Sequence, residues 1–170
     1  GISAGATPGS RVAETIITGG FYIHLVSNST VIDGFTIEQG YDNGSHKTGV
    51  VVGSATNVTV RNNIITDCGM VPAVVAQSDG IEVGYDSDNL TIENNEILDN
   101  WRGVYLNPSD GISITGNAIH ANNGVGVGIG SSGQSNLSIT GNNIHGHNVE
   151  GWGIDTVGSN VVAEDNTFNN

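Results

Sequence analysis

The chain has 170 residues, of which 36% are hydrophobic and 26 are glycine, and its formal net charge is −13. Only four residues are basic, which argues against nucleic acid and anionic membranes as partners. A single cysteine excludes an internal disulfide framework. No apolar stretch approaches the roughly 18 residues of a membrane-spanning helix.

Residues 1–20 are the least regular part of the chain. The run Pro8-Gly9-Ser10 indicates a turn, and Thr15 to Thr18 is predicted to be a short strand. We interpret residues 1–20 as an incomplete N-terminal coil. Because residues 166–170 stop inside a repeat and neither terminus has an amphipathic helical pattern, we expect the chain to be a segment of a longer protein.

From residue 21 onward the sequence is built from a repeated unit. In the clearest copy, Asn57 to Ile65, apolar Val58 and Val60 alternate with polar residues, as a half-buried strand requires. Related copies begin at positions 29, 89, 111, 136 and 160, so successive starts are separated by 28, 32, 22, 25 and 24 residues. A drifting period of this size is typical of a solenoid.

A second short strand follows each copy and has the pattern Gly-apolar-any-apolar. It begins at Gly49, Gly80, Gly103, Gly126 and Gly153, and Tyr22 to Leu25 takes its place in the first coil. Two or three strands per repeat without helical periodicity predict an all-β fold. The prediction is a single-stranded parallel β-helix of about six to seven coils without substantial helix, spanning residues 21–170, with strands paired at about 4.8 Å per coil.

One alignment column supports stacked coils because it contains asparagine in five successive repeats. Side-chain amides at the same turn of neighbouring coils can hydrogen-bond to one another and to the turn backbone. Asparagine also suits isolated turns, but five copies in register favour a ladder. The column consists of Asn63, Asn95, Asn117, Asn142 and Asn166.

These repeats resemble the right-handed parallel β-helix superfamily, which includes polysaccharide lyases, pectin hydrolases, mannuronan epimerases and many surface proteins. The resemblance covers Phe21 to Asn170 and implies the fold and its hand. It rests on scaffold residues. The tyrosine, aspartate and histidine cluster of the epimerases and the lysine and arginine pairs of the lyases have no residue-by-residue match here.

Unequal connections predict where a site lies. Long segments, residues 38–48 and 66–79, separate the first and second strands of two repeats, and loops of this kind often carry binding residues. They would flank the outward side chains of the second-strand sheet, where we predict a shallow groove. The predicted outward column is His24, Val51, Glu82, Tyr105, Gly128 and Asp155.

The densest polar group near this predicted groove is acidic. Four carboxylates could hold Ca²⁺, which takes oxygen ligands, although the EF-hand pattern is absent and solvated turn residues are an alternative. No cofactor is required by the sequence, and calcium is the candidate ion. The proposed calcium ligands are Asp79, Glu82, Asp86 and Asp88.

Aromatic residues beside these carboxylates predict sugar stacking, because an aromatic ring presents an apolar face with a polar rim. The candidate carbohydrate-binding residues are Tyr85, Trp101, Tyr105 and Glu82. The alternative for Trp101 is that it only covers a corner of the coil.

The same region contains parts of a catalytic site. Glycoside hydrolysis requires two carboxylates, for which Glu82 and a nearby aspartate are the candidates. Lyase or epimerase chemistry requires a base, such as Tyr105 or His46, and a cation such as Arg102 beside the uronate. The candidate catalytic residues are therefore Glu82, Arg102 and Tyr105.

Histidines offer a separate hypothesis. His120 and His145 share an alignment column, which predicts adjacent rings about 5 Å apart, with His147 nearby. They could bind a transition metal, but a histidine pair that only repeats with the solenoid is the favoured interpretation.

Two functional classes follow. The favoured one is a noncatalytic module of an extracellular, cell-surface or periplasmic protein, acting as a rigid spacer, an adhesive or a carbohydrate-binding face. Its expected partners are a polysaccharide or surface glycan, with flanking domains or other coils stacked on its ends. The alternative is a polysaccharide lyase, epimerase or hydrolase that acts in the predicted groove.

Overall fold

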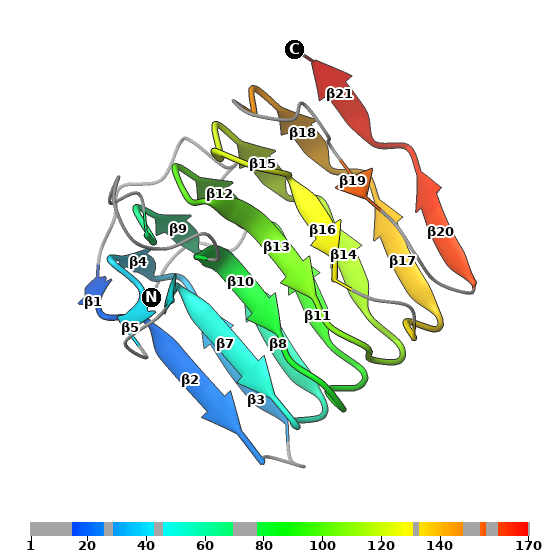
Figure 1. The fold of residues 1–170 in the computed structure, drawn as a ribbon, viewed down its shortest axis with the longest axis horizontal. Helices are drawn as coiled ribbons and strands as arrows, with labels where there is room; N and C mark the ends of the chain where they lie inside the picture. Colours follow the sequence, from blue (N-terminus) through cyan, green and yellow to red (C-terminus); the bar gives the residue numbers. More distant parts are fainter. Residues whose placement is uncertain are drawn as a thin grey trace.

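A computed structural model of the chain describes residues 15–25, 29–42, 46–69, 78–130, 133–147, 154–155 and 160–169. These residues form a solenoid with three long parallel sheets, and they contain no helix (Figure 1). The all-β parallel β-helix predicted from the repeats is confirmed. Among the described residues, no helix has the length and apolar character needed to cross a membrane.

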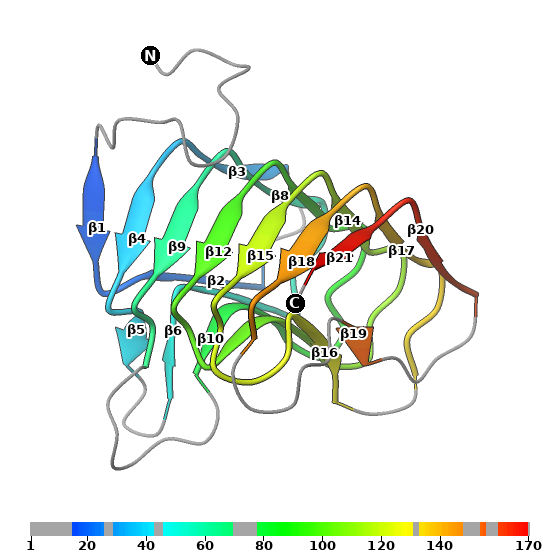
Figure 2. The same ribbon diagram turned by 90° about the horizontal axis from the view of Figure 1, so that it is seen from above.

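Sheet A has seven strands and crosses the solenoid as a row in Figure 2. In sheet order they are β1 (Ile16–Thr18), β4 (Thr36–Glu38), β9 (Ile64–Thr66), β12 (Glu96–Leu98), β15 (Ala118–His120), β18 (Asn143–His145) and β21 (Thr167–Asn169). The strand β1 lies where the sequence predicted one, at residues 15–18, and it pairs with β4 in parallel.

Sheets B and C have six strands each. Sheet B consists of β2 (Phe21–His24), β7 (Val50–Gly53), β10 (Asp79–Val83), β13 (Arg102–Leu106), β16 (Val127–Ile129) and β19 (Ile154–Asp155). Sheet C consists of β3 (Thr30–Asp33), β8 (Val58–Arg61), β11 (Thr91–Glu93), β14 (Ser113–Thr115), β17 (Leu137–Thr140) and β20 (Val161–Glu164).

Each coil passes through sheet B, then sheet C, then sheet A. The repeated unit Asn57 to Ile65 therefore contains two strands, β8 and β9, which are separated by a bend at Asn62 and Asn63. Asn62 has a positive φ of 54°, a conformation that asparagine tolerates better than most residues. From the first such triplet of strands to the last, the path makes about five turns, slightly fewer than the six to seven predicted.

The core is a narrow column of apolar side chains shared by all three sheets. Alternate residues of each strand point inward, so isoleucines from successive coils stack in register along sheet A, and Ile37, Ile65, Ile97 and Ile119 are fully buried. Because neighbouring coils share this core, a modest hydrophobic content is enough for a solenoid.

The predicted asparagine ladder lies at the bend between sheets C and A. The backbone N–H and side-chain Nδ2 of Asn95 both donate to Oδ1 of Asn117, at 2.9 and 3.0 Å. The same pair of bonds joins Asn117 to Asn142. Each side chain also donates to a carbonyl oxygen of the preceding coil, as Asn117 does to Ile92. The buried amides are thus satisfied within the solenoid.

Candidate functional site

Both long connections leave the solenoid at the corner where sheet A meets sheet B. One contains an antiparallel hairpin of β5 (Tyr41–Asp42) and β6 (Lys47–Thr48), and the other joins β9 to β10 (Figure 2). Residues 43–45 and 70–77 of these connections lie outside the described residues. The shared corner predicted from the loop lengths is confirmed, and it places both connections beside the start of the sheet B strands.

The outward column of sheet B has the predicted register, with one correction. Glu82 pairs with Val51 on one side and with Tyr105 on the other, and Tyr105 pairs with Gly128. In the first coil, however, Val51 pairs with Tyr22, whereas His24 pairs with Gly53. The placement of His24 in this column was wrong by two residues, because the glycine-led pattern of the first coil starts at Gly20, which precedes Phe21 as Gly49 precedes Val50.

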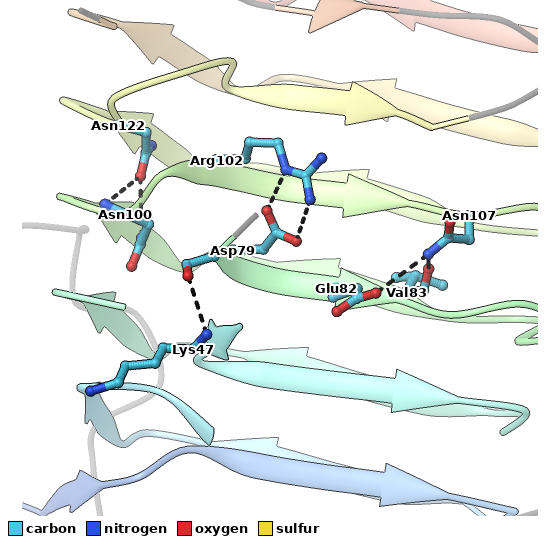
Figure 3. A network of polar contacts seen from close by, with 9 residues as sticks. Lys47, Asp79, Glu82, Val83, Asn100, Arg102, Asn107 and Asn122 are labelled. Carbon is cyan, nitrogen blue, oxygen red and sulfur yellow. Dashed lines mark hydrogen bonds and ion pairs between the residues drawn. The ribbon is translucent and has the colours of Figure 1, made fainter. Parts of the chain in front are cut away.

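An ion pair joins Asp79 and Arg102, which are register partners at the starts of β10 and β13 (Figure 3). Nε and Nη2 of Arg102 donate to the two carboxylate oxygens of Asp79 at 2.5 and 2.9 Å. The Asp79 side chain is 1% exposed and that of Arg102 is 15% exposed. A planar guanidinium that meets a carboxylate in this fork geometry is well ordered.

Burial dominates the ionisation of Asp79. Loss of hydration raises the pKa of its carboxyl group from 3.8 to about 6, although the hydrogen bond and charge of Arg102 act in the opposite direction. The negative charge of Glu82 adds to the upward shift. The pair therefore joins a permanently charged arginine to an aspartate that gains a proton under mildly acidic conditions.

Arg102 also covers the ring of Tyr105. Its guanidinium carbon lies 3.4 Å from the ring centroid, which is a close cation–π contact. The tyrosine extends toward the next coil, where Gly130 leaves room for its hydroxyl group and a side chain would clash with it. Asp79, Arg102 and Tyr105 thus form a connected group, which we call the Arg102 cluster.

The remaining carbohydrate-binding candidates lie on β10, in the turn after it and immediately before β13. Glu82 lies beside the Arg102 cluster, and its Oε1 is 3.5 Å from Nδ2 of Asn107 (Figure 3). Trp101 is half-buried immediately before β13, and Tyr85 is 60% exposed in the turn after β10. The structure therefore brings Glu82, Arg102 and Tyr105 together, while Tyr85 is carried on the following turn.

The four proposed calcium ligands have different surroundings in the structure. Asp79 binds Arg102, and Oδ1 of Asp88 accepts the backbone N–H of Asp110 at 2.9 Å. Asp86 is exposed in the turn that contains Tyr85. Within the described ranges, no group of three or more histidine, cysteine, aspartate or glutamate side chains is arranged to hold a metal. Calcium binding stays a prediction.

The family assignment follows from the whole chain and not from these side chains. Residues 11–170 match the family model described as right-handed beta helix region. The chain belongs to the right-handed β-helix family. A search of curated proteins found no match. Membership of this family establishes the right-handed β-helix scaffold. It does not establish what the sheet B face does, because a fold does not determine function, so that function has to be argued from the side chains of the face.

In this β-helix protein the predicted histidine column is present. His120 and His145 are register partners whose rings stack with centroids 5.1 Å apart and an interplanar angle of 4°. Nε2 of His120 lies 3.3 Å from Oε1 of Glu96. Burial lowers the pKa of His147, and the nearby His145 and His120 lower it further. Metal binding by these histidines stays a prediction.

The sequence comparison of repeats missed a second amide ladder, at the corner between sheets A and B. Both N–H groups of Asn100, from backbone and side chain, donate to Oδ1 of Asn122 at 3.1 and 3.2 Å (Figure 3). Oδ1 of Asn100 in turn accepts the backbone N–H of Cys68. Burial raises the pKa of Cys68 to about 12, so its thiol is unreactive. This ladder supports the strand starts from which Asp79 and Arg102 project.

Proposed function

We propose that the chain is a noncatalytic β-helix module of an extracellular, cell-surface or periplasmic protein, and that its sheet B face binds a glycan around Tyr105 and Glu82. The rigid solenoid serves as a spacer that presents this face. Support for the location is compositional: the chain is acidic, has one cysteine, and has few lysines. Support for the ligand comes from the Arg102 cluster.

One observation carries the preference for binding over catalysis. A lyase or epimerase needs an arginine that is free to neutralise the uronate and a tyrosine that is free to take a proton. Here both fork nitrogens of Arg102 are bound to Asp79, and its guanidinium plane rests on Tyr105. The arginine therefore orders the tyrosine, and a preorganised aromatic ring beside a carboxylate is suited to recognising sugar hydroxyl and C–H groups.

The charges on this face and on the whole chain favour a neutral glycan as the ligand. The face carries Glu82, and the positive charge of Arg102 is balanced by Asp79. With a formal net charge of −13 for the chain, a neutral polysaccharide is preferred to a polyuronate.

A second candidate, a polysaccharide lyase, epimerase or hydrolase, is favoured by the unusual ionisation of Asp79. A carboxyl group with a pKa of about 6 beside a second carboxylate is typical of a general acid. Against this role, the Asp79 side chain is only 1% exposed, so that Arg102 separates it from a ligand on the surface.

The two candidates are separated by one set of assays. Neutral and acidic polysaccharides are tested for binding with and without Ca²⁺, and the same wells are read for unsaturated products by ultraviolet absorbance and for new reducing ends. We expect binding of a neutral glycan without turnover. Products that vanish in Glu82→Ala and Tyr105→Ala would establish an enzyme and overturn the proposal.

A matched control tests whether Glu82 acts through its position. Glu93 lies in the same coil, on sheet C, and is half-exposed like Glu82. We expect Glu82→Ala to lose glycan binding and Glu93→Ala to keep it, with both variants retaining the wild-type circular dichroism spectrum. Equal losses in the two variants would show that general surface charge, and not the sheet B face, governs binding.

A further inference from the structure

A pair of stacked tyrosines lies beside β2, the edge strand of sheet B in the first coil. Tyr22, on β2, and Tyr41, on β5, have ring centroids 5.3 Å apart and an interplanar angle of 9°. The ring of His24 lies 5.6 Å from that of Tyr22 at an angle of 43°. We call Tyr22, His24 and Tyr41 the first-coil aromatic cluster.

The backbone fixes the position of these rings. A side chain at Gly20 would come within 2.5 Å of the Tyr41 backbone nitrogen, and one at Gly40 within 2.7 Å of the Thr48 nitrogen. Gly20 therefore allows the hairpin that carries Tyr41 to lie directly against the first coil, and Gly40 allows the two sides of the hairpin to approach closely. The backbone contacts of the hairpin, and not only the contact between the two rings, place Tyr41 against Tyr22. The pair is therefore organised before any ligand binds.

Core packing does not account for the tyrosine pair. Phe21 and Ile23, on either side of Tyr22, pack against the buried core, whereas Tyr22 points outward and is 53% exposed. Tyr41 is 37% exposed. In the stacked pair each ring covers one face of the other. The surface that stays exposed is apolar and has the two hydroxyl groups at its edge. That surface matches the C–H face of a pyranose ring.

The first-coil aromatic cluster is continuous with the proposed glycan face. Tyr22, Val51, Glu82 and Tyr105 are successive register partners across β2, β7, β10 and β13. Three strand spacings of about 4.8 Å place Tyr22 about 14 Å from Tyr105 along the solenoid axis. A glycan that advances by about one strand spacing per ring has one ring at Tyr22 and another at Tyr105 when it contains about four rings.

We propose that Tyr22 and Tyr41 form a second sugar-stacking platform, which binds the same neutral glycan chain that contacts Tyr105. The inference rests on the proposed function of the sheet B face and extends it to a ligand that lies along the axis. Short oligosaccharides reach one platform, and longer ones reach both. Affinity therefore increases with ligand length, and this increase depends on the tyrosine pair.

The test compares ligand lengths by isothermal titration calorimetry. The probes are cellohexaose, chitohexaose and maltohexaose with the matching disaccharides, and an oligogalacturonate as the acidic comparison. For the wild-type chain we expect at least tenfold tighter binding of one neutral hexasaccharide than of its disaccharide. In Tyr22→Ala and Tyr41→Ala this advantage falls to less than threefold.

Control variants distinguish the possible failures. Val31→Ala removes an exposed apolar side chain from the same coil on sheet C and should bind like the wild type. If Tyr105→Ala abolishes binding of the hexasaccharide while Tyr22→Ala and Tyr41→Ala leave it unchanged, the second platform is wrong and the proposed function stands. If the wild-type chain binds none of the neutral probes, the proposed function fails and the platform fails with it.

Discussion

Single buried amides determine how tightly neighbouring coils are joined. Asn142 is 1% exposed, and its Oδ1 accepts two hydrogen bonds from Asn117 while its Nδ2 donates to Ile114 and to Asn166. Asn142→Ala removes these bonds and leaves donors and acceptors of both neighbours unsatisfied. We expect a loss of roughly 2 to 4 kcal/mol in the free energy of unfolding, measured by chemical denaturation.

The adjacent residue provides the control for this prediction. Asn143 is exposed and points outward from sheet A. Asn143→Ala should change the free energy of unfolding by less than about 0.5 kcal/mol. Equal losses at the two positions would contradict the prediction, because they would show that the ladder hydrogen bonds of Asn142 do not determine the change in the free energy of unfolding.

Arg102 balances a buried charge, so its removal should have an effect that depends on pH. Arg102→Met leaves Asp79 without a counter-charge, and we expect a loss of roughly 3 to 5 kcal/mol at about pH 8. At about pH 5 the carboxyl group keeps its proton and the loss should be smaller. Arg61→Met breaks an exposed pair with Asp33 and should cost less than about 1 kcal/mol at either pH.

The wild-type chain should show the related dependence. Between about pH 4 and 6 the unfolded chain ionises Asp79, whereas the folded chain retains the proton because its pKa is about 6. The contribution of Asp79 to stability is therefore complete below about pH 4 and is lost as the pH rises through 6, by an amount on the order of 3 kcal/mol. Thermal unfolding across this range should reveal a slope that Asp79→Asn lacks.

At this scale the sequence predicted one amide ladder and missed the other. The ladder at Asn63 to Asn166 follows a fixed position in every repeat, so alignment reveals it. The second ladder contains only Asn100 and Asn122. The coil before them has Cys68 at the same position, and the coil after them has His147. Two asparagines at a corner of variable length give no periodic signal.

At the level of strands, the glycines that begin sheet B are required by contacts between coils. A Cβ atom at Gly80 would lie 2.5 Å from Cγ2 of Ile97 and 2.7 Å from the carbonyl oxygen of Gly103. Neither the core nor the next strand can move without disturbing the ladders. Gly80→Ala should therefore lower the free energy of unfolding by roughly 2 kcal/mol or more.

A glycine in open space is the comparison for this effect. Gly141 has a positive φ of 64°, and a Cβ atom at this position would meet no other atom within 4 Å. Its replacement by alanine introduces only backbone strain, on the order of 1 kcal/mol. A larger loss for Gly141→Ala than for Gly80→Ala, measured by denaturation, would contradict the role of close packing at the strand starts.

The same glycine pattern explains which strands could be placed from the sequence. Five glycine-led strands of sheet B were located correctly, whereas β2 was placed two residues late because the prediction started it at Tyr22 and not after Gly20. The repeated unit read as one strand is two, because an asparagine bend between β8 and β9 continues the polar pattern without a break. Periodicity identifies which side chains point inward, and it does not show where a coil turns.

For the whole molecule, charge repulsion should limit stability. The chain has 17 acidic and four basic residues. Screening by salt reduces their mutual repulsion, so we expect the melting temperature to rise between about 0.02 and 0.5 M NaCl. A constant or falling melting temperature would show that short-range pairs outweigh the net charge.

Calcium binding can be tested by comparing the effects of CaCl₂ and NaCl on the melting temperature. If the predicted site at Asp86 and Asp88 exists, CaCl₂ should raise the melting temperature more than NaCl of equal ionic strength. The excess should disappear in a variant with both residues changed to asparagine, and Asp99→Asn provides the control for loss of a single charge. An identical response to the two salts would exclude a calcium site of measurable affinity.

The fold could be predicted over nearly its whole length, and the family match confirms it. The candidate site could be predicted only as a set of residues near one corner. That Glu82 and Tyr105 are neighbours follows from the repeat alignment. That Arg102 turns inward to Asp79 and covers Tyr105 depends on side-chain conformations and on local hydration, which a pattern of residue types does not contain.

Both long connections leave at one corner, while the register of the three sheets continues past them unchanged. Length variation is therefore concentrated at a position where it does not disturb the alignment of the stacked coils. Such a chain can acquire new surface loops by insertion without repacking its interior. The same corner is the natural place to graft a foreign peptide, and repeated grafts on successive coils would be displayed in a row at intervals of about 4.8 Å.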